Sequence, residues 1–88
     1  MSEAFLVDVR EVEEHAGAHI AGSRLNPLRD FDPLACTPGE GQPLVLYCGS
    51  GMRSMEACKM LIANGGGDAF NLVGGIMAWH KAGHPIAR

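Results

Sequence analysis

The amino-acid sequence predicts an α/β fold, with a small, mainly parallel sheet of about four strands and helices on both of its faces. The clearest observation is the continuously apolar run 43–48, which is typical of a central parallel strand covered on both sides. Apolar strand-like segments also alternate with helix-compatible segments along the chain. With 88 residues, we expect one domain over residues 1–88.

Local signals place the other elements. Residues 5–9 are short, apolar and rich in β-branched side chains, which indicates a buried strand. The acidic segment 11–16 favours a helix closed by Gly17. The remaining predictions are a short strand around 24–25, one helical turn at 31–35 within the irregular segment 29–43, a strand at 69–73 and a helix at 76–82.

A helix is also predicted from about residue 53 to Ala63, where Asn64 and Gly65 supply a stop signal. Apolar side chains recur on one face of it at helical spacing. We expect this face to pack on the sheet through Ala57, Cys58, Leu61 and Ile62.

Composition and charge exclude several classes of protein. The formal net charge is -3, whereas a nucleic-acid binder would carry a basic stripe. The three cysteines are an odd number, which disfavours a small disulfide-bonded secreted domain. The N-terminus lacks the basic start of a signal peptide, and no apolar run approaches the roughly 20 residues of a membrane helix. We therefore expect a cytoplasmic protein that binds neither nucleic acid nor membrane.

The stretch that carries chemistry begins at Cys48, at the carboxyl end of the apolar strand, where open α/β sheets bind ligands. The glycine-rich loop after it can turn backbone N–H groups inward around an anion, next to a helix N-terminus. Such surroundings lower the pKa of a thiol, and the thiolate is the nucleophile. We predict Cys48 as the nucleophile, held in a binding loop of Gly49, Ser50, Gly51, Met52 and Arg53.

A simpler interpretation is that Cys48 only fills the core, because cysteine is among the most buried residue types. The two glycines, the arginine and the helix start that follow it favour the functional interpretation. The structural context of this cysteine therefore decides between the two.

Several segments resemble motifs of the rhodanese family, in the order in which the family has them. Residues 6–11 resemble its opening strand and turn, and 19–23 resemble its second motif. Residues 48–54 are similar to its active-site loop, 72–79 to its closing motif, and 83–86 to its end. Since the chain starts almost at the first motif, we expect a single, N-terminally minimal rhodanese-like domain.

The resemblance implies a sulfurtransferase that needs no cofactor. Cys48 would take sulfur from thiosulfate or a persulfide donor and pass it, as a persulfide, to a thiol or cyanide; a sulfur-relay protein is a further expected partner. Four residues separate Cys48 from Arg53, one fewer than in the phosphatases of this fold, which favours sulfur over phosphate. Gly49 stands where the family often has a basic residue, which predicts a donor less charged than thiosulfate.

Two other functions stay open. One is a non-catalytic rhodanese-like module that binds an anion or a partner, although inactive members commonly lose the cysteine that this chain retains. The other is a peroxide-sensing thiol protein, in which Cys36 would resolve an oxidised Cys48. Each predicts a different response to sulfur donors and to peroxide.

Asp8 and Arg10 are expected to support the site rather than to react. They lie at the end of the first predicted strand, close to the loop. A buried carboxylate needs partners, and we expect Arg10 to pair with Glu14.

The pairs His15–His19 and His80–His84 have the i, i+4 spacing of two metal ligands on a helix. A glycine interrupts each pair, so no metal is expected. We expect His19 to bond the backbone, and His80 and His84 to be exposed.

Three more side chains are assigned to the core: Cys58, Phe70 and Trp79. Met52, in contrast, falls at the tip of the loop. We expect it to be exposed, as part of a soft apolar rim for the acceptor.

Overall fold

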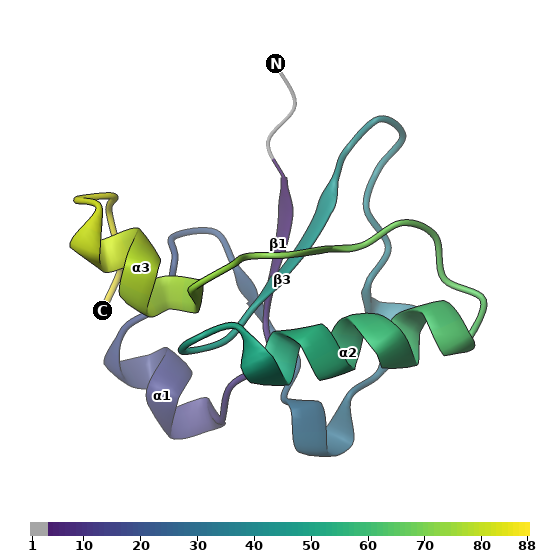
Figure 1. Cartoon of the computed structure of the whole chain (residues 1–88), viewed down its shortest axis with the longest axis horizontal. Coiled ribbons are helices and arrows are strands. Elements are labelled where there is room, and N and C mark those ends of the chain that lie inside the picture. The colour runs from purple at the N-terminus through teal and green to yellow at the C-terminus, as the bar shows by residue number, and fades with distance from the viewer. Residues whose placement is uncertain (1–3) are drawn as a thin grey trace.

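Four parallel strands form one sheet, in the order β2-β1-β3-β4. Figure 1 shows the two central strands, β1 and β3, side by side. The structure is a computed structural model that describes residues 4–88; the first three residues, which belong to the segment that argues against a signal peptide, lie outside the described part. No helix within residues 4–88 has the length and apolarity needed to cross a membrane, and a cytoplasmic location stays a prediction.

The strands are β1 (Phe5–Asp8), β2 (Arg24–Leu25), β3 (Leu44–Tyr47) and β4 (Phe70–Asn71). The helices are α1 (Val12–Gly17), α2 (Met52–Ala63) and α3 (Gly75–Lys81), with two 3-10 turns, η1 (Leu28–Asp30) and η2 (Pro33–Ala35), where the sequence predicts one.

The predicted α/β fold is confirmed, since helices pack on both faces of the sheet. On one face, Leu46 belongs to a buried cluster with Ala57 and Leu61 of α2. On the other face, Tyr47 clusters with Ile76 of α3. Successive strand residues point to opposite faces, which explains why these two neighbours belong to different clusters. In Figure 1, α2 extends to the right of β1 and β3, and α1 and α3 lie to the left.

The register of β1 against β3 decides where the candidate site lies. Asp8 pairs with Tyr47 at the last position of both strands. Because the strands are parallel, the segments that leave them run side by side, and Val9 N donates to Tyr47 O at 2.9 Å. The sheet therefore brings Arg10 and Cys48 to the same edge.

Two residues predicted to be in the core lie at the surface: Ile62 is 60% exposed and Phe70 is 59% exposed. Ile62 follows Leu61 by one position, which is about 100° around the helix axis. The buried residues of α2 are Ser54, Ala57, Cys58 and Leu61, as predicted for the last three. Phe70 lies on a two-residue edge strand, where its side chain is left uncovered.

Trp79 is half-buried, so the prediction of a core aromatic is confirmed in part. Its ring packs against the cluster that contains Tyr47 and Ile76. The indole Nε1 donates to the carbonyl of Pro85 at 2.8 Å. This contact ties the segment after α3 back onto the helix.

Candidate active site

Cys48 follows β3 directly, at the base of the loop that joins β3 to α2, and is 1% exposed. The Gly51 N–H group donates to its Sγ at 3.0 Å, and the Ser54 hydroxyl oxygen lies 3.5 Å from the same sulfur. The backbone N–H groups of Ser50 and Ser54 also hydrogen-bond to it. The loop that the sequence singles out therefore surrounds one sulfur atom with donors.

These donors change the acidity of the thiol. Burial disfavours the charged form of Cys48 and would raise its pKa. The hydrogen bonds from the Ser54 hydroxyl and from the N–H groups of Ser54, Gly51 and Ser50 outweigh burial, so the pKa lies below its usual value. The sequence points to Arg53 and the helix dipole as the cause. Hydrogen bonds from the loop and from the start of α2 are the larger favourable contributions, and the Arg53 guanidinium adds a hydrogen bond and a charge interaction with Cys48.

Asn71 of β4 completes the loop, and sequence reasoning missed it. Its Nδ2 donates to the Gly51 carbonyl at 3.1 Å, and its Oδ1 accepts from the Ser54 hydroxyl. A carbonyl only accepts, so these two contacts together define the orientation of the amide. The Ser54 hydroxyl has one proton, so at any moment it donates to Asn71 Oδ1 or to Cys48 Sγ and not to both. No local signal marks Asn71, because β4 reaches the loop only by pairing with β3.

We expect Ser54→Ala to raise the pKa of Cys48, because it removes the hydroxyl donor. A hydrogen bond to a charged group contributes about 1.5–3 kcal/mol, so the ionisation constant should fall at least about tenfold. The ultraviolet absorbance of the thiolate during a pH titration measures this. Burial raises the pKa of Cys36 and of Cys58, so their signals appear later in the titration.

Ser50→Ala is the matched control for this titration. Ser50 contributes through its backbone N–H group, which the substitution retains. The titration of Cys48 should therefore stay close to that of the wild type. Equal shifts in the two variants would show that the Ser54 hydroxyl has no special role.

The N-terminus of α3 packs against the loop from the other side. The N–H groups of Ile76 and Met77 donate to the carbonyls of Cys48 and Gly49 at 2.9 and 3.1 Å. Gly75 has a φ of +60°, and a Cβ atom there would lie 2.3 Å from the Cys48 carbonyl oxygen. Glycine is therefore required where α3 meets the loop.

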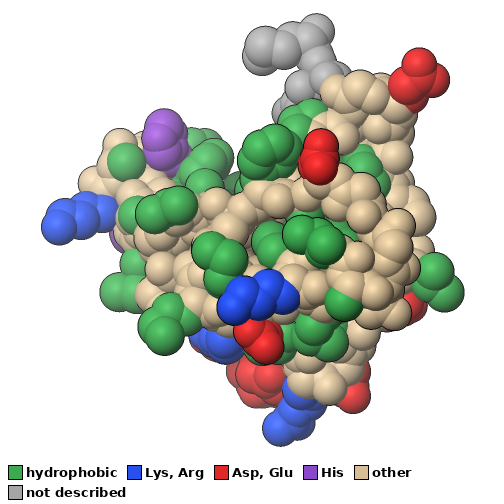
Figure 2. Space-filling view, turned by 45° about the vertical axis from the view of Figure 1, so that its right-hand side comes forward, with side chains coloured by type: hydrophobic (Ala, Val, Ile, Leu, Met, Phe, Trp, Pro, Cys, Tyr) green, Lys and Arg blue, Asp and Glu red, His purple; other side chains and the backbone are tan. Residues whose placement is uncertain are grey.

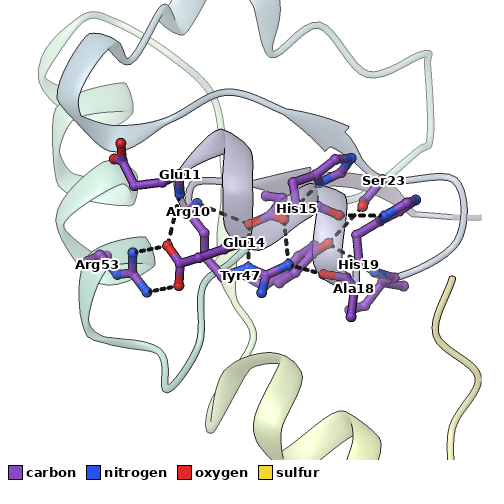
Figure 3. Close-up of polar contacts among 11 residues, drawn as sticks. Arg10, Glu11, Glu14, His15, Ala18, His19, Ser23, Tyr47 and Arg53 are labelled. Carbon is purple, nitrogen blue, oxygen red and sulfur yellow. Dashed lines mark hydrogen bonds and ion pairs between the residues drawn. The ribbon is translucent and has the colours of Figure 1, made fainter. Parts of the chain in front are cut away.

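Arg53, at the other end of the loop, is held by Glu14 of α1 (Figure 3). Its Nη1 and Nη2 donate to Oε1 and Oε2 of Glu14 at 2.7 and 3.0 Å. The N–H group of Glu11 also donates to Glu14, in a capping box that starts α1. The expected pair between Arg10 and Glu14 is wrong, because this carboxylate faces α2 while Arg10 turns back to Asp8.

Asp8 is the centre of a second polar network, fully buried at the end of β1. The side chain of Arg10 donates to both carboxylate oxygens at 2.9 and 2.8 Å, and His15 Nδ1 lies 2.8 Å from Oδ2. Burial would raise the pKa of Asp8, but the hydrogen bonds from Arg10 and His15 outweigh it and lower the pKa. Arg10 Nη2 also donates to the Ala18 carbonyl, so the network joins β1 to the C-terminal end of α1. These contacts fit the supporting role predicted for Asp8 and Arg10.

The histidines form no convergent set of ligands. The rings of His15 and His19 are stacked, with centroids 4.1 Å apart, and His19 Nδ1 donates to the His15 carbonyl, which confirms the predicted backbone contact. His80 and His84 are exposed, as predicted. In the part of the chain that the structure describes, no three His, Cys, Asp or Glu side chains are grouped as metal ligands.

Cys36 and Cys58 are buried and not disulfide-bonded. The sulfur of Cys36 accepts a hydrogen bond from Asn26 Nδ2 at 3.7 Å. Burial, and then the charge of a Cys36 thiolate, raise the pKa of Cys58. These contacts lend no support to the hypothesis that Cys36 resolves an oxidised Cys48. The resolving role of Cys36 stays a prediction.

Apolar side chains are exposed beside the loop. Met52 is 80% exposed, as predicted, and Met77 is 67% exposed. The hydrogen bond from Met77 N to Gly49 O places the second of these side chains at the start of α3, next to the loop. Figure 2 shows, for one face of the molecule, that hydrophobic side chains reach the surface at many points.

Comparison with known proteins identifies the family. The model of the rhodanese-like domain matches residues 1–82. An uncharacterized protein of Synechocystis sp. is 40% identical over 83 residues, which are 94% of this chain but only 46% of that protein. A protein named Sulfurtransferase from Allochromatium vinosum is 36% identical over 84 residues, with 96% of this chain and 78% of that protein covered. A rhodanese-related protein from Thermoplasma volcanium has a similar crystal structure, with a TM-score of 0.81 and 26% identity over 98% of this chain and 84% of that one. The resemblance found in the sequence is confirmed, and this chain belongs to the family of rhodanese-like domains.

Proposed function

We propose that this chain is a sulfurtransferase that carries sulfane sulfur as a persulfide on Cys48. The observation that supports this most directly is the set of donors from Ser50, Gly51 and Ser54 around one sulfur atom. Such donors stabilise the thiolate, which is the reactive form of a cysteine nucleophile. The family and the name of the Allochromatium relative point to the same activity.

The proposed reaction has two steps. The thiolate of Cys48 attacks the outer sulfur of thiosulfate or of a persulfide, and the S–S bond of the donor breaks with its electron pair leaving on sulfite or on a thiolate. An acceptor thiolate or cyanide then attacks the outer sulfur of the Cys48 persulfide, and Cys48 leaves as a thiolate. The binding loop from Gly49 to Arg53 holds the outer sulfur between the steps. We propose a sulfur-relay protein as a further acceptor or donor of this sulfur.

Mass spectrometry of the intact protein tests the first step. Wild-type protein treated with thiosulfate, or with the persulfide of 2-mercaptoethanol, should gain the mass of one sulfur atom. Cyanide should remove this sulfur and release thiocyanate. Cys48→Ala should gain nothing, whereas Cys36→Ser should behave like the wild type.

The same experiment separates the alternatives. A non-catalytic module would bind an anion in the loop and gain no sulfur from either donor, although circular dichroism would show a folded protein. A gain of sulfur on Cys48→Ala equal to that on the wild type would mean that another cysteine is the carrier. Either result would overturn the proposed function.

A further inference from the structure

The charge of the loop is compensated from outside the loop. Arg53 is the only charged residue among residues 48–53. Its guanidinium group makes two parallel hydrogen bonds, of 2.7 and 3.0 Å, to the carboxylate of Glu14 (Figure 3). This bidentate arrangement is the strong form of an arginine–carboxylate contact. The positive charge beside Cys48 is therefore already paired before any substrate arrives.

Glu14 is charged and fixed in place. The hydrogen bonds from Arg53 lower the pKa of Glu14 to about 2, so the carboxylate is ionised at neutral pH. The N–H group of Glu11, at 2.9 Å, holds the same carboxylate at the start of α1. With Cys48 as a thiolate, the three groups Cys48, Arg53 and Glu14 carry one net negative charge. A doubly charged anion gains no net attraction from such a site.

The loop has room for a second cation but does not contain one. A Cβ atom on Gly49 would meet only Arg53 Nη2, at 3.5 Å, which is an ordinary contact distance. The φ of Gly49 is not positive, so a larger residue is compatible with the backbone. The neighbouring exposed side chains, Met52 and Met77, are apolar. The surroundings of Cys48 thus match a substrate of low charge.

We propose that Glu14, by pairing with Arg53, makes the site selective for sulfur donors that carry at most one negative charge, such as the hydropersulfide of an uncharged thiol, over the thiosulfate dianion. This inference rests on the proposed function. The Cys48 thiolate attacks the terminal sulfur of the hydropersulfide, the S–S bond of the donor breaks, and the electron pair leaves on the inner sulfur as a thiolate. The transferred sulfur keeps its proton, so Cys48 becomes a hydropersulfide. The released thiolate takes a proton from water.

The test compares the loading rates of two probes, thiosulfate and 2-mercaptoethanol persulfide, by mass spectrometry of the intact protein. We expect Glu14→Gln to raise the ratio of the thiosulfate rate to the persulfide rate by at least about tenfold, because it uncovers the charge of Arg53. The amide introduced by this substitution still offers one oxygen to the guanidinium group. Glu13→Gln changes the charge equally on an exposed neighbouring position and should leave the ratio within about twofold.

A second variant acts on the same ratio and keeps Glu14 in place. Gly49→Lys adds a cation next to Arg53 and should also raise the ratio, even if Glu14→Gln fails to fold. A folded Glu14→Gln variant whose ratio stays at the wild-type value would overturn the inference. Where Glu14→Gln does not fold, an unchanged ratio in folded Gly49→Lys would overturn it instead. Wild-type protein that accepts sulfur from neither probe would overturn the proposed function itself, and the inference with it.

Discussion

Replacement of Asp8 by asparagine is expected to lower the free energy of unfolding by about 3 kcal/mol, measured by urea denaturation. The carboxylate is fully buried and accepts three hydrogen bonds from Arg10, whose side chain is itself buried. Removing one charge of a buried pair leaves the other without compensation, which costs about 3–5 kcal/mol. Asparagine keeps one oxygen acceptor, so we place the effect at the lower end. Domains of this size have only about 5–15 kcal/mol of stability in total.

Arg29→Gln is the matched control for this variant. It breaks an exposed ion pair with Glu11, in which the charged atoms are 3.8 Å apart. Such surface pairs contribute about 0–1 kcal/mol to stability, so the free energy of unfolding of this variant should be close to that of the wild type. A loss for Asp8→Asn as small as that for Arg29→Gln would contradict the importance of the buried network.

The dependence of stability on pH gives a second measurement on the same variant. The pKa of Asp8 in the folded protein lies below its ordinary value of 3.8. The stabilisation of the fold by ionised Asp8 is therefore complete above pH 3.8, and it is lost as the pH falls through the lower folded-state pKa. The stability of the wild type should fall more steeply than that of Asp8→Asn below about pH 4, since asparagine does not titrate. If the stabilities of the two proteins fall equally steeply below about pH 4, Asp8 is not a source of the pH dependence.

Gly75→Ala is expected to lower the free energy of unfolding by a similar amount, about 2–5 kcal/mol. An alanine at a φ of +60° pays about 1–2 kcal/mol in backbone strain. Its Cβ atom would also lie 2.3 Å from the Cys48 carbonyl oxygen and 2.5 Å from that of Gly49. These are backbone atoms, so no side-chain rotation relieves the overlap, and overpacking of this kind costs about 1–3 kcal/mol or more. Urea denaturation measures the loss.

Gly65→Ala separates the two causes. Gly65 also has a positive φ, of +79°, but a Cβ atom there meets nothing within 4 Å. Gly65→Ala should therefore lower the free energy of unfolding only by the backbone strain, about 1–2 kcal/mol. Equal losses in the two variants would mean that α3 moves away from the loop at no further cost. In Gly75→Ala, we also expect slower sulfur loading of the molecules that stay folded, because the contacts from Ile76 and Met77 hold the loop.

The local pattern of the sequence accounts for the elements and for the centre of the site. The apolar run at 43–48 predicts β3, the glycine-rich stretch after it predicts the loop, and Cys48 falls between them. These features depend on neighbouring residues only, so one stretch of chain carries the whole signal. The exposed positions of Ile62 and Phe70 were not predictable in this way, because burial depends on what packs over a side chain.

The fold class, the likeness to rhodanese-like domains and the candidate nucleophile Cys48 follow from the sequence by itself, because strand period, glycine spacing and motif order are local properties of the chain. The partners of the charged groups were decided by the tertiary structure. Glu14 is 39 positions from Arg53, and Asn71 is 17 positions from Ser54. The register of the sheet and the packing of α1, α2 and β4 bring these atoms together. The physical reason is that a carboxylate pairs with whichever cation the folded backbone places within hydrogen-bonding distance, so Glu14 binds Arg53 and leaves Arg10 to Asp8.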